Sequence, residues 1–372
     1  MPGDAKTSRA FGCKLYLILS YHWTLSFFMR YNLLMSLIVA VLLSMVTSKI
    51  VYFGFTPNYA ADIFSRKAFN GRFDHDVYKY RILCKYLLFY VDDWLNKDMP
   101  EKGAEARILI NTRDASERFY FAFYYLNTFF LILTSIMVVL LLDLGRNFLF
   151  SKMEKSLIIF LAPMLICLSQ FTVCCYDVSS YFFQLLILYL FLQFFDRYYW
   201  GSIFTIGALI VLSTLNRESS ALSVSMVGLL LLTRYGINRK ILYSISALAA
   251  VYLITYVVLR LLVVDPTHMR VVNLQAGHLL IDTNLIGLIF WGLFLYLPLN
   301  ISATTENRYL IGAFFLFSLP YIYTCLKDGV LWEVRLYIPL FLGALFLSKL
   351  DTSMNVFRLS DLTLRISRRE MQ

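Results

Sequence analysis

The chain has 372 residues, of which 59% are hydrophobic and 16% are charged, and its formal net charge at pH 7 is +10. Soluble domains carry about a quarter charged residues, so this composition excludes a water-soluble fold and favours a helical membrane protein. The basic residues flank apolar segments and form no run with interleaved aromatics, which indicates a role in membrane topology and excludes a nucleic-acid partner.

The N-terminal segment, residues 1–32, contains a short apolar and aromatic stretch at residues 15–29 between Lys14 and Arg30. A perpendicular span needs about 20 residues, so we expect this stretch to be an interfacial or re-entrant helix. The alternative is an additional span, which would move the N-terminus to the other side of the membrane.

Continuous apolar segments then recur through the rest of the chain. We expect spans near residues 33–53, 119–142, 157–173, 178–195, 201–215, 219–233, 241–264, 284–300, 309–326 and 336–348. The predicted fold class is an all-α polytopic membrane protein with about 10 transmembrane helices, or about 11 if residues 15–29 also span. Several segments are short, so some helices should be bent, tilted or broken. Residues 33–348 form one transmembrane domain, and residues 349–372 a basic cytoplasmic tail.

The first polar loop, residues 54–118, is the longest connection between spans. Within it, residues 76–95 have a helical pattern with an amphipathic face, which predicts a juxtamembrane helix lying along the membrane surface. The apolar stripe comprises Val77, Tyr80, Leu83, Leu87, Val91 and Trp94, and the polar residues Arg81, Lys85 and Asp92 lie opposite.

Two carboxylates, Asp74 and Asp76, flank His75 just ahead of that helix. One carboxylate held near an acceptor hydroxyl could act as a general base. The pair could also hold a divalent cation such as Mg²⁺ or Mn²⁺, which needs two or more converging oxygen ligands. The structural alternative is helix capping, in which a carboxylate accepts backbone N–H groups at the helix start.

A second charged cluster, Arg217 and Glu218, interrupts two short apolar segments. The pair could neutralise itself in a turn. Because the flanking segments are short, however, we expect the turn to lie inside the bundle, where the forked guanidinium of Arg217 would suit a phosphate.

The third cluster lies at residues 327–335 and includes Glu333 and Arg335. Residues two apart do not face each other on a helix, so we expect each to find a partner elsewhere. Asp177, near the start of another span, could join them. His268 and His278, in the loop at residues 265–283, have the simpler interpretation of solvated side chains.

The distribution of basic residues predicts the orientation of the chain. The short outer loops and the adjoining span ends hold only Arg217, Arg260, Arg270, Lys327 and Arg335, and the other side holds most of the remaining basic residues. This bias places both termini in the cytoplasm and all three charged clusters outside. The sequon at Asn300 then falls on the cytoplasmic side, which favours a bacterial inner membrane.

This layout resembles the GT-C superfamily of polytopic membrane glycosyltransferases over residues 33–340. The resemblance rests on the long first outer loop with its acidic residues and on Glu333, Arg335 and Pro339, which are similar to a late motif of lipid-linked mannosyltransferases. The His-Lys and Phe of that motif are absent here, so the resemblance does not extend to mannose.

The resemblance implies an inverting glycosyltransferase that moves a sugar from a polyprenyl-phosphate-linked donor to a lipid or glycan acceptor at the non-cytoplasmic face. It implies Asp74 or Asp76 as the base. We expect Arg217 and Arg335 to contact the donor phosphate, Glu218 and Glu333 to orient those arginines, and Arg81 and Asp177 to contribute to substrate binding. The chemistry would serve envelope polysaccharide or glycolipid assembly and would not require a metal.

Two rival functions fit the same layout. An O-antigen-type polysaccharide polymerase also joins lipid-linked sugars outside, but such enzymes usually have their large loop late in the chain. A transporter or flippase for a lipid-linked or anionic solute would favour inverted repeats and charges near the middle of spans. The sequence shows no such repeat, and its charges gather at span ends.

Overall fold

The computed structural model describes residues 32–55, 63–75, 77–98, 116–145, 147–171, 173–197, 199–263, 282–328 and 331–352. The expected interfacial helix at residues 15–29, most of the basic tail, and His268 and His278 lie outside these ranges. Over the described ranges the protein is helical, with one isolated antiparallel bridge between Phe148 and Leu350 and no named strand.

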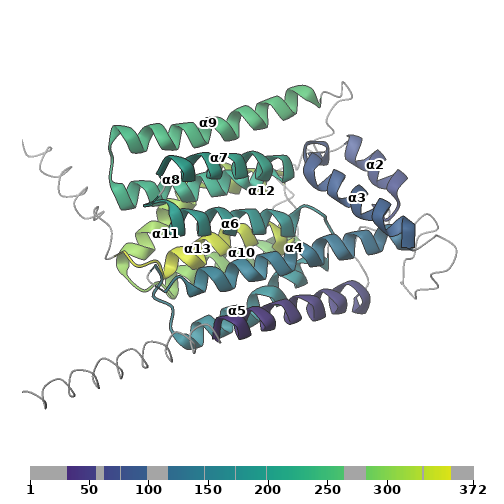
Figure 1. Cartoon of the computed structure of the whole chain (residues 1–372), viewed down its shortest axis with the longest axis horizontal. Coiled ribbons are helices and arrows are strands. Elements are labelled where there is room, and N and C mark those ends of the chain that lie inside the picture. The colour runs from purple at the N-terminus through teal and green to yellow at the C-terminus, as the bar shows by residue number, and fades with distance from the viewer. Residues whose placement is uncertain are drawn as a thin grey trace, which may run out of the picture.

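The described chain forms a bundle of antiparallel helices (Figure 1). A first helix, Asn32–Gly54, precedes the labelled ones. The others are α2 (Arg66–His75), α3 (Ile82–Asp98), α4 (Glu117–Asp143), α5 (Lys152–Leu168), α6 (Asp177–Phe194), α7 (Tyr199–Asn216), α8 (Ala221–Tyr235), α9 (Arg239–Leu262), α10 (Asp282–Asn300), α11 (Thr305–Phe317), α12 (Leu319–Asp328) and α13 (Ile338–Ser348). Short 3-10 turns include η2 (Val77–Tyr80), η4 (Glu218–Ser220) and η6 (Val334–Leu336).

Six of the described helices are long and apolar enough to cross a membrane: Asn32–Gly54, α4, α6, α7, α9 and α10. The pair α11 and α12 passes the same test together but is bent by 56°. Pro320, in the first turn of α12, cannot continue the hydrogen-bond ladder of α11, which explains a break there. The other expected spans are the shorter helices α5, α8 and α13, of 17, 15 and 11 residues.

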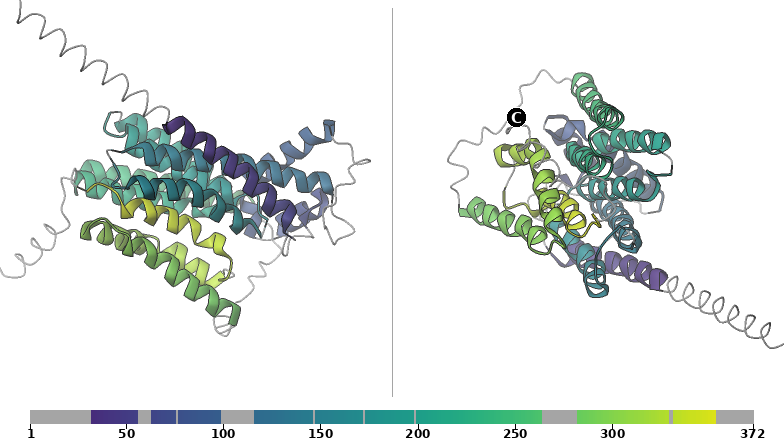
Figure 2. Two further views of the ribbon diagram at one scale, coloured as in Figure 1. Left: turned by 90° about the horizontal axis from the view of Figure 1, so that it is seen from below. Right: turned by 90° about the vertical axis from the view of Figure 1, so that its left-hand side faces the viewer.

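Helices α4 and α6 form the centre of the bundle. In each, 67% of the most apolar 18-residue stretch is buried inside the protein, compared with 11% in α9 and 22% in α10. The first helix packs along α4 (Figure 2) through hydrogen bonds between Ser44 and Ser135 (2.8 Å) and between Ser48 and Thr128 (2.5 Å). The outward faces of α9 and α10 are apolar and exposed, as expected for helices that contact lipid. The chain is therefore a multi-pass helical membrane protein.

The charged clusters lie at one end of the bundle. Helices α2 and α3 cap this end (Figure 1), where α3 packs against α4 and α7. We call it the α3 end. At the opposite end lie the connections from α4 to α5, α6 to α7, α8 to α9 and α10 to α11, together with the end of α13. Backbone hydrogen bonds from Leu149 N–H to Lys349 O (2.7 Å) and from Ala303 N–H to Ser348 O (2.9 Å) join two of these connections to the residues at the end of α13.

The expected surface helix at residues 76–95 differs in its bounds and in its buried face. The structure divides this region between η2 and α3, and α2 precedes them. The buried positions of α3 include Cys84, Leu88, Asp92 and Leu95, whereas Trp94 is exposed. Asp92 was expected on the polar face; it is buried because arginines from α2 and α4 neutralise it.

That neutralisation ties α2 and α3 to the bundle. Arg118 Nε lies 2.9 Å from one Asp92 oxygen, and Arg66 Nη1 lies 3.3 Å from the other. Arg66 also pairs with Asp93, and Arg118 donates to Asn96 Oδ1 at 2.6 Å. Charge-assisted bonds from two separate helices thus hold α3 in place.

Gly343 on α13 marks a close helix contact that a substitution can test. A Cβ there would meet Phe314 Cζ at 2.8 Å and Gln184 Nε2 at 3.2 Å, and Phe314 is fully buried. We expect Gly343→Ala to destabilise the fold by about 1 to 3 kcal/mol through overpacking. Fluorescence-monitored thermal unfolding in detergent measures this. Gly292→Ala on α10 is the matched control, since a Cβ there meets no atom within 4 Å; an equal loss in both variants would contradict this packing.

Candidate functional site

A buried carboxylate shared by two arginines lies at the α3 end. Asp177 opens α6 and is fully buried. Arg217 Nη1, from the turn after α7, lies 2.5 Å from Asp177 Oδ1, and Arg335 Nη1, from η6, lies 3.1 Å from Asp177 Oδ2. Both arginines are themselves buried. The expected meeting of these three residues is therefore present in the structure.

Arg335 is held on all sides. Its Nε and Nη2 atoms lie 2.7 and 2.6 Å from Glu333 Oε2, and its Nη1 also contacts Cys174 Sγ. The expectation that Glu333 and Arg335 would not pair was wrong. It assumed an α-helix, whereas Glu333 has extended backbone angles (φ −79°, ψ 100°) before a 3-10 turn, so both side chains project to the same side.

Arg217 and Glu218 do not neutralise each other. Arg217 is extended (φ −164°, ψ 145°), which sends its side chain to Asp177, while Glu218 receives Arg81 Nε at 3.2 Å. Burial raises the pKa of Glu218, but the charges of Arg81, Arg217 and Arg260 and a backbone hydrogen bond together outweigh it and hold the pKa below its usual value. The two charges of this turn thus join separate segments of the chain.

The ring of Tyr176 links the two ion-pair groups. The Arg81 guanidinium lies 4.1 Å from the ring centroid and that of Arg217 lies 5.8 Å from it. Together, Arg81, Asp177, Arg217, Glu218, Glu333 and Arg335 carry equal numbers of positive and negative charges. We call these six residues the charge network.

Aromatic and amide side chains fix the backbone that carries Arg335. Tyr181 donates to Arg335 O at 2.9 Å and Tyr321 donates to Leu336 O at 3.0 Å. Gln184, one turn further along α6, donates to Pro339 O at 2.8 Å. The network is therefore preorganised by helices α6 and α12.

The guanidinium groups differ in their remaining capacity for a ligand. All three nitrogens of Arg335 have partners, whereas Arg217 donates only through Nη1 to the part of the chain that the structure describes. A guanidinium has five N–H donors in a planar fork. Of the two arginines expected to contact a phosphate, Arg217 therefore has the greater free donor capacity.

The two candidate bases lie near this network in sequence but outside the described side chains. The backbone of Asp74 belongs to the last turn of α2, and Asp76 lies between the described residues 75 and 77. Asp74 precedes Arg81 by seven residues, which span at most about 25 Å even when extended. Their roles as bases stay predictions. The alternative in which Asp74 caps the following α-helix does not fit the sequence spacing of a cap, because α3 begins only at Ile82.

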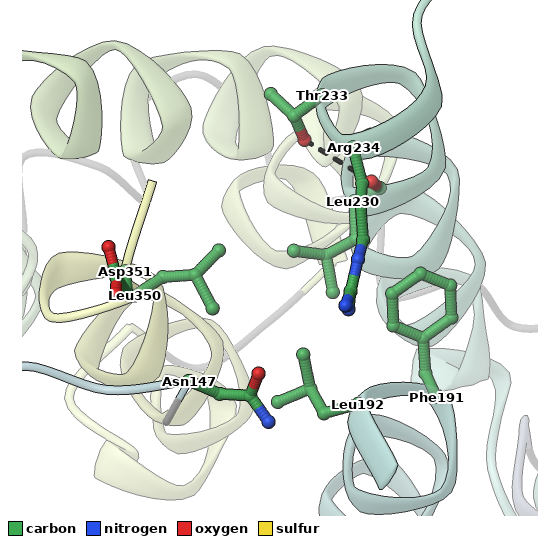
Figure 3. A pocket seen from close by; sticks show the side chains of 8 residues that line it. All are labelled: Asn147, Phe191, Leu192, Leu230, Thr233, Arg234, Leu350 and Asp351. Atoms are coloured by element: carbon green, nitrogen blue, oxygen red, sulfur yellow. Dashed lines mark hydrogen bonds between the residues drawn. The ribbon is translucent and has the colours of Figure 1, made fainter. Parts of the chain in front are cut away.

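A small hollow lies at the opposite end of the bundle (Figure 3). Its lining residues are Asn147, Phe191, Leu192, Leu230, Thr233, Arg234, Leu350 and Asp351. Arg234 pairs there with Asp196. None of the residues expected to form a site lines this hollow, so it is separate from the charge network.

Arg260 is a residue that the sequence interpretation used only as a topology marker. It lies in the last turn of the apolar helix α9, with its guanidinium over the ring of Tyr80, beside the charge network. A charge in the last turn of a long apolar helix was the available signal. Nothing in the pattern along α9 indicates which rings this guanidinium contacts.

No group of three or more His, Cys, Asp or Glu side chains in the described ranges could hold a metal ion. The Asp74 and Asp76 side chains, which carried the expectation of a divalent cation, lie outside those ranges. Comparisons with protein-family models, curated proteins and solved structures find no match to this chain.

Asp177→Asn should destabilise the protein by about 3 to 5 kcal/mol, because it leaves two buried arginines without their shared carboxylate. Thermal unfolding of the purified protein measures the loss. Asp196→Asn removes an ion-paired carboxylate whose side chain is 54% exposed at the opposite end, and should cost about 0 to 1 kcal/mol. Equal midpoints for the two variants would mean that the network contributes nothing to folding.

Proposed function

We propose that this protein is a GT-C-like glycosyltransferase that moves a sugar from a polyprenyl-phosphate-linked donor to an acceptor hydroxyl at the non-cytoplasmic face. The observation that carries the proposal is the charge network: six ionisable side chains from separate segments converge at the α3 end of an otherwise apolar bundle. Charges at membrane depth are costly and therefore mark functional sites by default.

The location of the network supports an anionic, lipid-borne substrate. It lies where the start of α6, the turn after α7 and η6 meet, next to the segment that leads into α3, and we propose that a lipid-borne substrate reaches it from the lipid phase. Three arginines in this setting can accept a phosphate in place of, or beside, their carboxylate partners. An apolar bundle face accommodates the lipid chain.

In the proposed reaction, Asp74 or Asp76 takes the proton of the acceptor hydroxyl. The acceptor oxygen attacks the anomeric carbon, the bond from that carbon to the phosphate oxygen breaks, and polyprenyl phosphate leaves with its negative charge. Attack opposite the leaving group inverts the anomeric centre. Arg217 and Arg335 stabilise the phosphate, Arg81 and Asp177 contribute to the pocket, and Glu218 and Glu333 hold the arginines in place.

The distribution of basic residues supports the orientation of the proposal. The turns at the opposite end carry Lys152, Lys155, Arg197, Arg239 and Lys240, which is typical of a cytoplasmic side. The α3 end then faces outward, in a bacterial inner membrane, and the product belongs to envelope polysaccharide or glycolipid assembly.

The test is a transfer assay in proteoliposomes with a panel of polyprenyl-phosphate sugars. We expect Asp74→Asn or Asp76→Asn to lower kcat by about 100-fold or more, since a positioned base contributes about 10² to 10⁴ in rate. Asp143→Asn, an exposed carboxylate at the opposite end of α4, is the control and should keep full activity.

Full activity in both single variants and in the double variant would remove the base assignment. Uptake or flipping of a labelled lipid-linked solute by the same proteoliposomes, with no sugar transferred, would instead make the protein a transporter. Chain elongation of a lipid-linked repeat unit would identify a polymerase.

A further inference from the structure

Arg260 lies between two aromatic rings at the edge of the charge network. Its guanidinium carbon is 4.3 Å from the centroid of Tyr80 and 4.7 Å from that of Tyr256, one turn earlier on α9. Tyr252 stacks on Tyr256 with centroids 5.9 Å apart. Such rings attract a cation through their negative faces and fix the plane of the guanidinium.

Within the described ranges no carboxylate forms an ion pair with this guanidinium at contact distance, and Glu218 acts on it only at longer range. Its Nε atom is buried and makes no hydrogen bond. The other three arginines beside it are each paired with a carboxylate: Arg81, Arg217 and Arg335. A buried unsatisfied donor is rare in native proteins. The two Nη groups also donate no hydrogen bond within the described ranges, so the outer edge of the guanidinium can receive an anion.

The surroundings of Arg260 connect the charge network to the lipid phase. On one side, Tyr80 directly precedes Arg81, and Tyr252 donates to the backbone oxygen of Glu218 at 3.4 Å. On the other side, the outward face of α9 is apolar, with Ile254 63%, Leu261 67% and Leu262 77% exposed. Both features meet within the last turns of one helix.

We propose that Arg260, held between Tyr80 and Tyr256, binds the phosphate of a membrane lipid whose apolar chain lies along the outer face of α9. The inference deepens the proposed function, on which it rests for the identity of that lipid as the sugar donor. It assigns the first phosphate contact to the arginine that has no ion pair at contact distance, ahead of the contacts with Arg217 and Arg335.

The lipid source follows from the position of the site. Free phosphate would gain only the polar contacts at the Tyr80 ring, where Arg260 and Lys79 lie, and nothing from the exposed apolar face of α9. A phosphate with a hydrocarbon chain satisfies both the guanidinium and that face. Binding should therefore need the phosphate and the chain together.

The experiment measures binding to the purified full-length chain in nonionic detergent by calorimetry, with farnesyl phosphate as the probe. Farnesol and inorganic phosphate supply each half of the ligand alone. We expect Arg260→Gln to weaken farnesyl phosphate binding about tenfold or more, the loss of one charge-assisted contact. Arg239→Gln removes the same charge from the exposed first turn of the same helix and should leave Kd unchanged.

Tyr256→Leu provides an independent variant, since it keeps the charge and removes one ring; binding should weaken several-fold. Equal effects of Arg260→Gln and Arg239→Gln would reduce the result to general electrostatics and overturn the proposal. Inorganic phosphate binding as tightly as farnesyl phosphate, with the same dependence on Arg260, would overturn the lipid source. A shift in unfolding midpoint is checked for each variant.

The two proposals fail separately. Arg260-dependent binding of farnesyl phosphate without any sugar transfer would reject the glycosyltransferase and keep the lipid-phosphate site. Sugar transfer whose donor KM and probe binding are unchanged in Arg260→Gln would keep the glycosyltransferase and reject this site.

Discussion

The sharing of Asp177 by Arg217 and Arg335 is the interaction on which the α3 end depends. It joins the start of α6, the break between α7 and α8, and the turn before α13, which lie far apart in sequence. A fully buried carboxylate is stable in an apolar bundle only when cations surround it, and each arginine in turn needs that carboxylate. The charges therefore bring three helix termini close together, because each of these residues lies where a helix begins or ends.

The short helices of the bundle follow from the same constraint. If α7 and α8 formed one continuous helix, the side chains of Arg217 and Glu218 would point in directions set by that helix, and they would not reach Asp177 and Arg81. The extended backbone at Arg217 and the 3-10 turn at residues 334–336 give each side chain its own direction. Such irregular backbone is tolerated at membrane depth only when buried in protein. Here Tyr181 of α6 and Tyr321 of α12 donate hydrogen bonds to carbonyl oxygens of this irregular backbone.

A second group of ion pairs fixes α2 and α3 on the bundle. Asp92 draws Arg66 and Arg118 together and fixes α2 and α3 on α4, while Arg81, just before α3, reaches Glu218. Helices α2 and α3 are thus joined to the charge network through one segment, residues 77–98. Arg260 approaches this segment from the lipid side through Tyr80. A lipid phosphate bound at Arg260 would meet the network at its junction with the surface helices.

The sequence by itself determined the membrane class, the helical periodicity, the approximate positions of the apolar segments and the gathering of Asp177, Arg217, Glu218, Glu333 and Arg335 at span ends, because hydropathy and the cost of buried charge are local properties. Only the tertiary structure decided which charge pairs with which. Glu333 pairs with Arg335 because the backbone between them is not α-helical, and Asp92 turns inward because two distant arginines neutralise it. Pairing depends on backbone direction and on neighbours from elsewhere in the chain, neither of which a pattern along one segment contains.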